Sequence, residues 1–328
     1  MNLADRLPFL HRRTALTRAT RAFFDARGYT EVETPYAVQT PGEEVHVRAL
    51  QTETSDAYGQ TRTLWLHTSP EFAMKKLLAA GAGPIVQFAR VWRNHEGSPR
   101  HQIEFTMLEW YRPGLAFAGL MDETEALLRA VLPPTVRSNG ITTRLDRFER
   151  LTVAEAFTRH AAGDVLGTAG NAPALAASAN ATLRHNETWE DLFFRLLLDR
   201  VEPHLGQHHP TFLTHWPTAQ AALARRDPTD PRVALRFELF VCGIELANAF
   251  EELTDPHEQR ARFTHDRARR HALYGPDWPI DETLLAALPD MPPTSGIALG
   301  FDRLAMLASG ADRIDQVQWL PNPMSHTE

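Results

Sequence analysis

The stretch Ile85–Tyr111, IVQFARVWRNHEGSPRHQIEFTMLEWY, decides how the fold is interpreted. It predicts two partly apolar strands, 87–93 and 105–111, joined by a polar loop that carries arginine and histidine. Alternate side chains of a strand share one face, and that face of the second strand carries Phe105, Met107, Glu109 and Tyr111. With Arg93 at the mouth of the loop, this face could hold a nucleotide and a small cationic substrate. An ordinary hairpin with a charged tip would show the same pattern.

Composition limits the class of protein. With 328 residues, 43% of them hydrophobic, the chain can bury a large core, as one large α/β or α+β domain or two small ones. A formal net charge of -7 lacks the basic balance typical of proteins that bind nucleic acid through its phosphates. The single cysteine, Cys242, excludes an internal disulfide and a CxxC metal site. No stretch has the length of a signal peptide or a membrane span, so we expect a soluble cytoplasmic protein.

The stretch 236–253, RFELFVCGIELANAFEEL, predicts a second hairpin with a two-residue loop. This loop pairs Phe240 with Glu245, so Glu238 and Glu245 share a face with their Cβ atoms roughly 7–8 Å apart. Two carboxylates at that separation can share a magnesium ion or its waters. Two solvated glutamates on an exposed face are the alternative, although the apolar flanks favour a covered sheet.

The end of the second hairpin leaves one question open. Simple alternation places Asn248, Phe250 and Glu252 on the face opposite Glu245. If all of them serve one site, a bulge must interrupt the strand near Ala247.

The rest of the chain predicts a mixture of helices and short strands. Helical patterns mark residues 12–27, 117–131, 189–201 and 256–274, and strand patterns mark 29–34, 64–67 and 211–214. The segment 38–60 is predicted to be irregular. The segment 132–187 is also predicted to be irregular, as a variable insertion with short helices such as 153–160. The stretch 295–307 predicts a strand, a glycine hinge and a helix. Gly300 would allow close approach of a ligand to the backbone, and Arg303 lies near the helix start.

A helix that stops at Gly81 is predicted to begin at Ser69-Pro70-Glu71. Ser69 is expected as its N-cap and Pro70 as its first residue. Capping alone would explain Ser69 and Glu71, because acidic residues favour the first turn.

In their order along the chain, these segments resemble the catalytic domain of class II aminoacyl-tRNA synthetases, specifically the lysyl branch. GYTEVETP is similar to motif 1, FARVWRNHE…IEFTMLEWY to motif 2 and GIALGFDRLAML to motif 3, while HTSPE and GIELANAFEELTD are similar to lysyl signatures. The resemblance implies a single α+β domain over residues 1–328, an antiparallel sheet flanked by helices, and a homodimer. It places motif 1 at about 14–35, motif 2 at about 85–111, the variable insertion at about 132–187 and motif 3 at about 295–308.

The resemblance also implies a role for each matching residue. Arg93 and Arg303 would be catalytic and hold the α- and γ-phosphates of ATP. The ATP-binding set would be Arg93, Asn94, His95, Phe105, Glu245, Leu246, Gly300 and Arg303, with Phe105 stacked on adenine. Glu238 and Glu245 would hold Mg²⁺. The lysine-like substrate would be bound by Ser69, Pro70, Glu71, Glu109, Tyr111, Asn248 and Glu252.

Three positions depart from the lysyl pattern. His95, followed by Glu96, stands where the family has a glutamate that reads adenine. Gln102-Ile103 replaces the usual Asn-Pro. Ala298 replaces a glycine, which narrows the pocket and matches a paralogue that favours a β-amino acid.

The resemblance implies an ATP-dependent ligase without an anticodon-binding domain. Among lysyl-like enzymes the chain is most similar to a stand-alone paralogue that joins (R)-β-lysine or lysine, through an adenylate, to a lysine of translation elongation factor P. One alternative is a truncated enzyme that makes lysyl-adenylate for tRNA or a lipid. Another is a catalytically silent paralogue that acts as a binding module.

Overall fold

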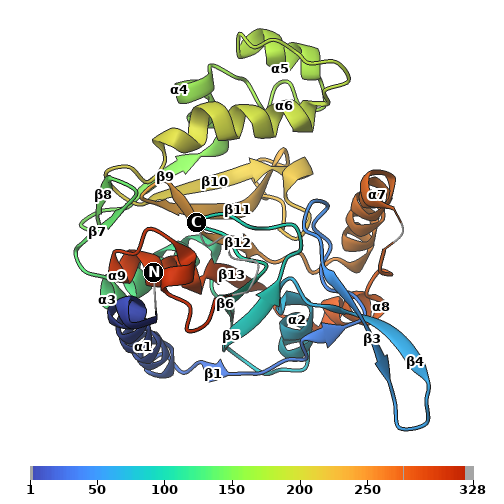
Figure 1. The fold of residues 1–328 in the computed structure, drawn as a ribbon. Helices are drawn as coiled ribbons and strands as arrows, with labels where there is room; N and C mark the ends of the chain where they lie inside the picture. The colour runs from blue at the N-terminus through green and yellow to red at the C-terminus, as the bar shows by residue number, and fades with distance from the viewer. Residues whose placement is uncertain (1–2, 276, 322–328) are drawn as a thin grey trace. The chain divides into compact units, whose positions relative to one another are not determined.

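The computed structural model describes residues 3–275 and 277–321 (Figure 1). The chain divides into two compact units, one formed by residues 1–116 and 252–328 and the other by residues 117–251. No helix in the described residues is long and apolar enough to cross a membrane. The predicted single domain stays a prediction.

Four strands of the first unit pair side by side in the order β1-β5-β6-β13. Their bounds are β1 Thr30–Glu31, β5 Ile85–Trp92, β6 Glu104–Pro113 and β13 Thr294–Gly300. The β1–β5 pair is parallel, whereas β5–β6 and β6–β13 are antiparallel. The helices of this unit are α1 Leu3–Asp25, α2 Glu71–Ala79, α7 Pro256–Tyr274, α8 Glu282–Ala287 and α9 Phe301–Ser309, with short 3-10 turns at Leu288–Asp290 and Ile314–Gln316.

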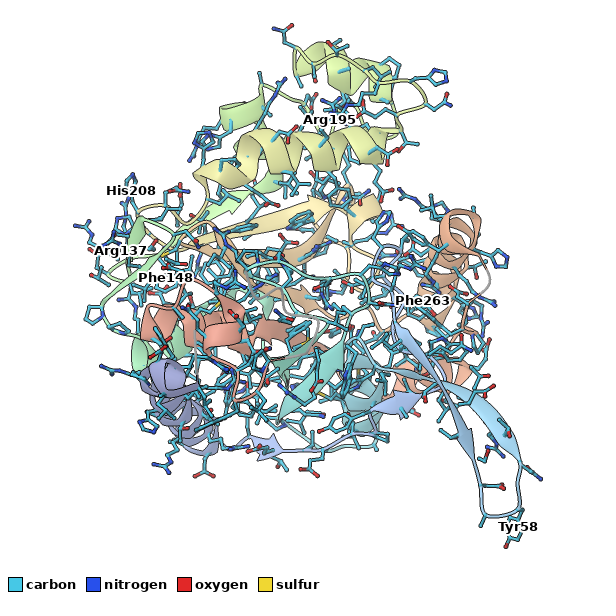
Figure 2. The ribbon with its side chains drawn as sticks, viewed as in Figure 1. Tyr58, Arg137, Phe148, Arg195, His208 and Phe263 are labelled. Carbon is cyan, nitrogen blue, oxygen red and sulfur yellow. The ribbon has the colours of Figure 1, made fainter. Side chains whose placement is uncertain are left out.

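A three-stranded sheet in the first unit corrects one prediction. Within 38–60, predicted to be irregular, β3 (Leu50–Ser55) forms a hairpin with β4 (Thr61–Leu66), and β4 also pairs with β2 (Ala37–Val38). Much of β3 and the start of β4 are exposed, so no apolar alternation marked the hairpin. Figure 2 shows Tyr58 at its tip, where a turn held by the Asp56 carboxylate leaves the side chain 92% exposed.

Four strands of the second unit pair side by side in the order β12-β11-β10-β9. Their bounds are β9 Glu149–Thr152, β10 Thr211–Pro217, β11 Val233–Val241 and β12 Ile244–Glu251, and a separate hairpin joins β7 Thr135–Ser138 to β8 Ile141–Arg144. The β10–β11 and β11–β12 pairs are antiparallel, and β9–β10 is parallel. The helices are α3 Phe117–Val131, α4 Val153–Ala161, α5 Ala172–Ser178 and α6 Trp189–Leu196, followed by a π-helical turn at Leu197–Val201 and 3-10 turns at Glu202–His204 and Thr218–Gln220.

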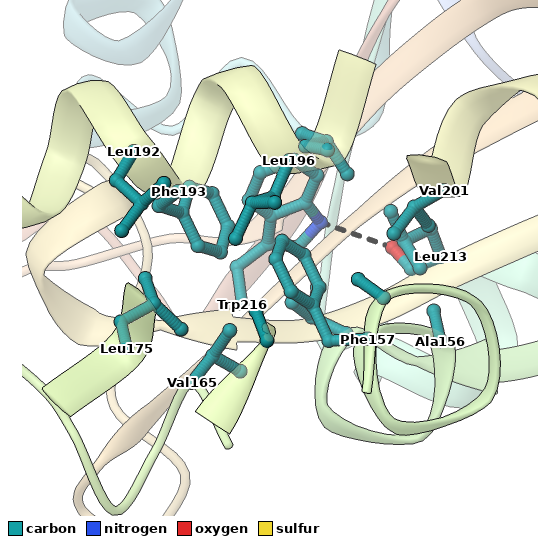
Figure 3. Close-up of a cluster of buried hydrophobic side chains, with 14 of the residues drawn as sticks. Ala156, Phe157, Val165, Leu175, Leu192, Phe193, Leu196, Val201, Leu213 and Trp216 are labelled. Atoms are coloured by element: carbon teal, nitrogen blue, oxygen red, sulfur yellow. Dashed lines mark hydrogen bonds between the residues drawn. The ribbon is translucent and has the colours of Figure 1, made fainter. Parts of the chain in front are cut away.

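A buried aromatic cluster organises the helical part of the second unit (Figure 3). Phe157 of α4 and Phe193 of α6 stack with ring centroids 4.9 Å apart. Trp216 of β10 packs edge-on to Phe193, and its indole N–H donates to the Leu213 carbonyl at 3.0 Å. The predicted variable insertion is therefore structured, and it contributes both helices and strands.

Candidate active site

The hairpin predicted from Ile85–Tyr111 is present and organises the first unit. Gln87 of β5 lies opposite Glu109 of β6, and on the other side of β6 Glu109 lies opposite Ala298 of β13. Two residues along, Gly296 lies opposite Tyr111. Small residues on β13 therefore flank the two polar side chains of β6.

Glu109 is a buried carboxyl with two donors. The Ser69 hydroxyl donates to one oxygen at 2.5 Å, and the Tyr111 hydroxyl donates to the other at 3.0 Å. Burial, with the charge of Glu71 adding to it, raises the pKa of Glu109 to about 8. The structure thus brings together four predicted substrate residues, although they come from different elements.

The start of α2 differs by one residue from the prediction. The helix is assigned from Glu71, with Pro70 before it in a helical conformation. The predicted capping contact of Ser69 is nevertheless present, because an N-cap side chain accepts from an amide of the first turn. The Ser69 hydroxyl still accepts a hydrogen bond from the Glu71 amide at 3.0 Å while it donates to Glu109. Ser69 therefore connects the helix start to the acidic pocket.

Glu252 is the second buried carboxyl of this pocket. Burial raises its pKa to about 7, although Lys75 lowers it. One Glu252 oxygen lies 2.6 Å from the Lys75 ammonium, and the other lies where a Cβ at position 296 would come within 2.6 Å of it. Among the described residues, this second oxygen has no hydrogen-bond donor. A buried acceptor of this kind suits a cationic ligand, because a buried carboxylate oxygen without a hydrogen-bond donor is energetically costly.

Lys75 was not identified from the sequence. It lies one turn after Glu71 on α2, its side chain is 1% exposed, and its ammonium lies 2.6 Å from a Glu71 oxygen. The sequence signal that could have identified Lys75 is a lysine on the buried face of a helix, four residues after an acidic residue with which it can pair.

The predicted phosphate-binding arginines lie at the ends of motifs 2 and 3. The Arg93 guanidinium lies over the Phe105 ring at 5.5 Å, and its Nε donates to the Thr68 carbonyl at 3.5 Å. Gly300 is the N-cap of α9, and a Cβ added there would meet only the Arg303 side chain, at 3.4 Å or more. The described protein atoms therefore leave room beside Gly300.

His101 is a second residue that sequence reasoning missed. Its Nε2 lies 2.5 Å from Nη2 of Arg303, and its Nδ1 lies 2.8 Å from the Ser98 hydroxyl. Burial and the charges of Arg303, Arg93 and Arg100 lower its pKa to about 4. The neutral ring accepts from Arg303 and donates to Ser98, which orients the arginine. Its position inside the motif 2 loop was the only sequence signal.

Asn94 and His95 occupy the turn that leaves β5. The Asn94 amide donates to the Arg48 carbonyl at 2.6 Å, and the Asn94 side chain accepts from the His95 amide at 2.9 Å. His95 is exposed and has a left-handed φ of 63°. Their assignment to ATP stays a prediction.

The second unit contains the predicted Glu238/Glu245 pair. Phe240 pairs with Glu245 as predicted, and Glu238 pairs with Asn248. The register shifts between these pairs, which leaves Leu246 as the extra, buried residue of a bulge. The bulge puts Glu245 and Asn248 on one face with Glu238. A bulge was required near Ala247 for this arrangement, and one is present.

The carboxyl of Glu238 is buried on this face. Arg236 lies 2.6 Å from one oxygen and also donates to Asn248 at 3.2 Å. Burial, with the charge of Glu245 adding to it, raises the pKa of Glu238 to about 8. Two neighbouring carboxyls whose charges repel fit a divalent cation. The described residues contain no group of three or more His, Cys, Asp or Glu side chains that could hold a metal.

Comparison with known proteins defines the class. Residues 5–323 match the family described as tRNA synthetases class II (D, K and N), and the chain belongs to this family. This confirms the predicted family and α+β fold class, and with them an ATP-using ligase.

Individual relatives are more specific. A protein of Klebsiella pneumoniae subsp. pneumoniae named Elongation factor P--(R)-beta-lysine ligase is 43% identical over 317 residues, 95% of this chain and 94% of its own. A protein with the same name from Edwardsiella ictaluri is 43% identical over 314 residues, which is 94% of this chain and 93% of that protein. Another from Salmonella arizonae is 43% identical over 317 residues, which is 95% of this chain and 94% of that protein.

Proposed function

We propose that this chain is an ATP-dependent ligase that activates (R)-β-lysine, or lysine, and transfers it to the ε-amine of a lysine on translation elongation factor P. The names of relatives that match nearly the whole chain support the substrate and the acceptor. The observation that carries the proposal is the acidic pocket of the first unit, where one oxygen of buried Glu252 pairs with Lys75 and the other has no donor among the described residues. A substrate ammonium supplies such a donor.

The substrate would be held by charge and hydrogen bonds. Glu252 and Tyr111 receive the distal amine, helped by Glu109, while Ser69 and Glu71 receive the head of the amino acid. Pro70 lines the pocket beside them, and Asn248 of the second unit is assigned to the substrate from the resemblance alone. Ala298, opposite Glu109, takes up space that a glycine would leave, which favours a β-amino acid.

The nucleotide would be held mainly by arginines. Arg93 takes the α-phosphate and Arg303 the γ-phosphate, because a guanidinium fork matches phosphate oxygens. Phe105, under the Arg93 guanidinium, stacks on adenine. Gly300 lets the nucleotide approach the backbone, and the remaining assigned contacts come from Asn94, His95, Glu245 and Leu246.

Glu238 and Glu245 would hold Mg²⁺, which neutralises phosphate charge when it is bound. Their shared face and raised Glu238 pKa fit this cation. Arg236 gives Glu238 a counterion within the chain.

The reaction has two steps. In the first step the substrate carboxylate oxygen attacks the α-phosphorus of ATP. The bond from this phosphorus to the bridging oxygen of the β-phosphate breaks, pyrophosphate departs, and an aminoacyl-adenylate is formed. The acceptor amine then attacks the carbonyl carbon, the bond to AMP breaks, and the nitrogen loses a proton as the amide forms. Arg93 and Arg303 position the phosphates and stabilise their charge, which is the main contribution that this chemistry needs.

The test is ligation with purified elongation factor P, Mg²⁺-ATP, and either (R)-β-lysine or α-lysine, followed by mass spectrometry. We expect the factor to gain one residue, and an acceptor-lysine-to-arginine factor to gain none. A mass gain on tRNA alone would indicate a lysyl-adenylate enzyme with another acceptor. Absence of any adenylate would indicate a silent paralogue.

The Arg93→Ala variant tests the active-site assignment. Because it removes the α-phosphate contact, we expect ATP–pyrophosphate exchange to fall by about 100-fold or more. Undiminished exchange would contradict the assignment. Arg260→Ala is the matched control, since the Arg260–Glu282 pair is exposed and lies outside the proposed site and motif 1.

We also propose that the ligase is a cytoplasmic homodimer. The proposal rests on the resemblance of GYTEVETP and its preceding helix to motif 1. Light scattering coupled to gel filtration tests the dimer.

A further inference from the structure

Lys75 places a permanent charge inside the acidic pocket. Its ammonium lies 2.6 Å from a Glu71 oxygen and 2.6 Å from a Glu252 oxygen, and the side chains of Lys75 and Glu252 are 1% and 0% exposed. None of the proposed substrate contacts requires this lysine. Its role therefore needs a separate explanation.

The arrangement is poorly suited to stabilising the fold alone. The neighbouring helix residues Met74 and Leu78 belong to an apolar cluster, and a buried ion pair is often no more stable than apolar residues of similar volume. Lys75 occupies one Glu252 oxygen at 2.6 Å, whereas the other Glu252 oxygen has no hydrogen-bond donor among the described residues. The cluster is therefore not closed on itself, and its carboxylates can accept further donors.

The charges around Lys75 indicate what it does. Glu71 faces it from α2 and Glu252 from the segment before α7. Glu109 of β6 does not pair with Lys75 but lies within the charge of Glu71, and Arg93 is a further cation that acts on Glu109. Burial alone would lower the pKa of Lys75, but the charges of Glu252 and Glu71 outweigh it and raise the pKa. Lys75 therefore stays cationic and opposes the mutual repulsion of the carboxylates.

We propose that Lys75 is a positioning residue, a fixed counterion that offsets the repulsion between Glu71 and Glu252 and holds both carboxylates in place to receive the ammonium groups of a diamino acid. This inference rests on the proposed function and deepens it. The substrate ammonium binds the carboxylates through the lone pairs that Lys75 leaves open.

Burial leaves the pKa of Glu252 at about 7 even though Lys75 lowers it. Without the lysine charge this pKa would rise further, and the Glu252 carboxyl would stay protonated at a higher pH. A diamino acid could then bind only after that proton had left. Its apparent Kd would rise by about tenfold for each pH unit between the solution and the raised pKa. The defect would disappear as the pH rises, which a packing defect would not do.

The experiment is calorimetric titration of (R)-β-lysine into the full chain at several pH values from about 6.5 to about 8.5. We expect Lys75→Met to bind at least about tenfold more weakly than wild type at the acid end, with a difference that narrows as the pH rises. Titration in buffers of different ionisation enthalpy should show additional proton release on binding. Lys75→Arg, which keeps the charge, should retain the wild-type pH profile.

The control for the helix is Lys76→Met. Lys76 is the next residue of α2, but its side chain is 35% exposed and pairs with Asp281 instead of the pocket acids. We expect wild-type affinity at every pH. Lys75→Gln is measured beside Lys75→Met, because the glutamine amide can donate hydrogen bonds to the carboxylates without carrying a charge. If Lys75→Met does not fold, Lys75→Gln still tests the loss of the charge.

Three outcomes separate the two proposals. Equal affinity of the Lys75 variants, or a loss by the same factor at every pH, would overturn the counterion role. Wild-type binding of (R)-β-lysine without transfer to elongation factor P would overturn the proposed function alone, since binding still decides the role of Lys75. If wild type binds no (R)-β-lysine, both proposals fail.

Discussion

At Gly296 the backbone of β13 passes Tyr111 and Glu252 too closely for any side chain. An added Cβ would lie 2.2 Å from the Tyr111 ring and 2.6 Å from a Glu252 oxygen. Gly296 has no left-handed backbone, so the requirement is one of space. This glycine therefore sets the distance between the two groups that would receive the distal amine.

For Gly296→Ala we expect displaced Tyr111 and Glu252 side chains. The apparent KM for the lysine substrate should rise by about tenfold or more, with a stability loss of about 1–3 kcal/mol from overpacking. Steady-state pyrophosphate exchange and urea unfolding measure the two effects. Gly300→Ala is the comparison: its Cβ meets only the flexible Arg303 side chain, so the KM for ATP should change while stability stays near wild type. Equal effects of both variants on lysine KM would contradict this interpretation.

Individual polar residues were predictable only where a motif carried them. Glu109 and Tyr111 follow from strand alternation, and the structure confirms that they are adjacent. Lys75 and His101 were missed because each functions through a partner distant in sequence, Glu252 and Arg303 respectively. Sequence spacing does not show such long-range partners.

At the scale of elements, α1 extends further toward the N-terminus than the predicted 12–27, and its added turns carry buried Arg6, which donates to the Trp319 carbonyl at 3.2 Å. A second buried arginine anchors the helix further along. Arg13 forms an ion pair with Asp302 of α9 at 2.5 Å and donates to Thr106 of β6 at 2.9 Å. Asp302 is 1% exposed, so the pair is buried. These contacts hold the helix that carries Arg303 against β6.

Arg13→Ala leaves the buried Asp302 carboxylate without its cation. We expect a loss of about 3 kcal/mol in the free energy of unfolding, because a single buried charge is costly. Arg21→Ala on the same helix breaks an exposed pair, with side chains 53% and 40% exposed, and should cost below about 1 kcal/mol. Urea denaturation of both variants provides the measurement, and similar losses would show that α1 is not anchored through Asp302.

Helices and strands whose apolar residues recur at regular spacing could be predicted from the sequence, whereas elements without such spacing could not. The helix at 256–274 has the predicted bounds, and its N-cap Asp255 accepts from the amides of His257 and Glu258. The β3–β4 hairpin lacks a buried face and was missed. The bulge at Leu246 could be recognised only as a requirement of the site, since a one-residue register shift leaves no mark in composition.

At the scale of the whole molecule, buried acids make stability depend on pH. Burial raises the pKa of Glu43 and Glu252 to about 7 and that of Glu109 and Glu238 to about 8, from an ordinary value of 4.5. Between the unfolded and folded values, the folded chain binds more protons, so stability declines as the pH rises. His101 acts in the opposite direction, but only between its ordinary 6.5 and its folded value of about 4.

Above about pH 6.5 the decline from the acids is therefore unopposed by His101, and the melting temperature should fall toward pH 8.5. Glu109→Gln removes one of these acids while keeping an acceptor for Ser69, so we expect a shallower fall and a gain on the order of 1–2 kcal/mol at the basic end. Its lysine-dependent pyrophosphate exchange should be reduced, because the pocket loses a carboxylate. Glu155→Gln is the control: Glu155 belongs to the exposed capping box of α4 and its pKa is lowered, so the slope above pH 6.5 should match wild type. Thermal unfolding across this range decides the prediction, and a Glu109→Gln slope equal to that of wild type would show that Glu109 is already ionised in the folded chain.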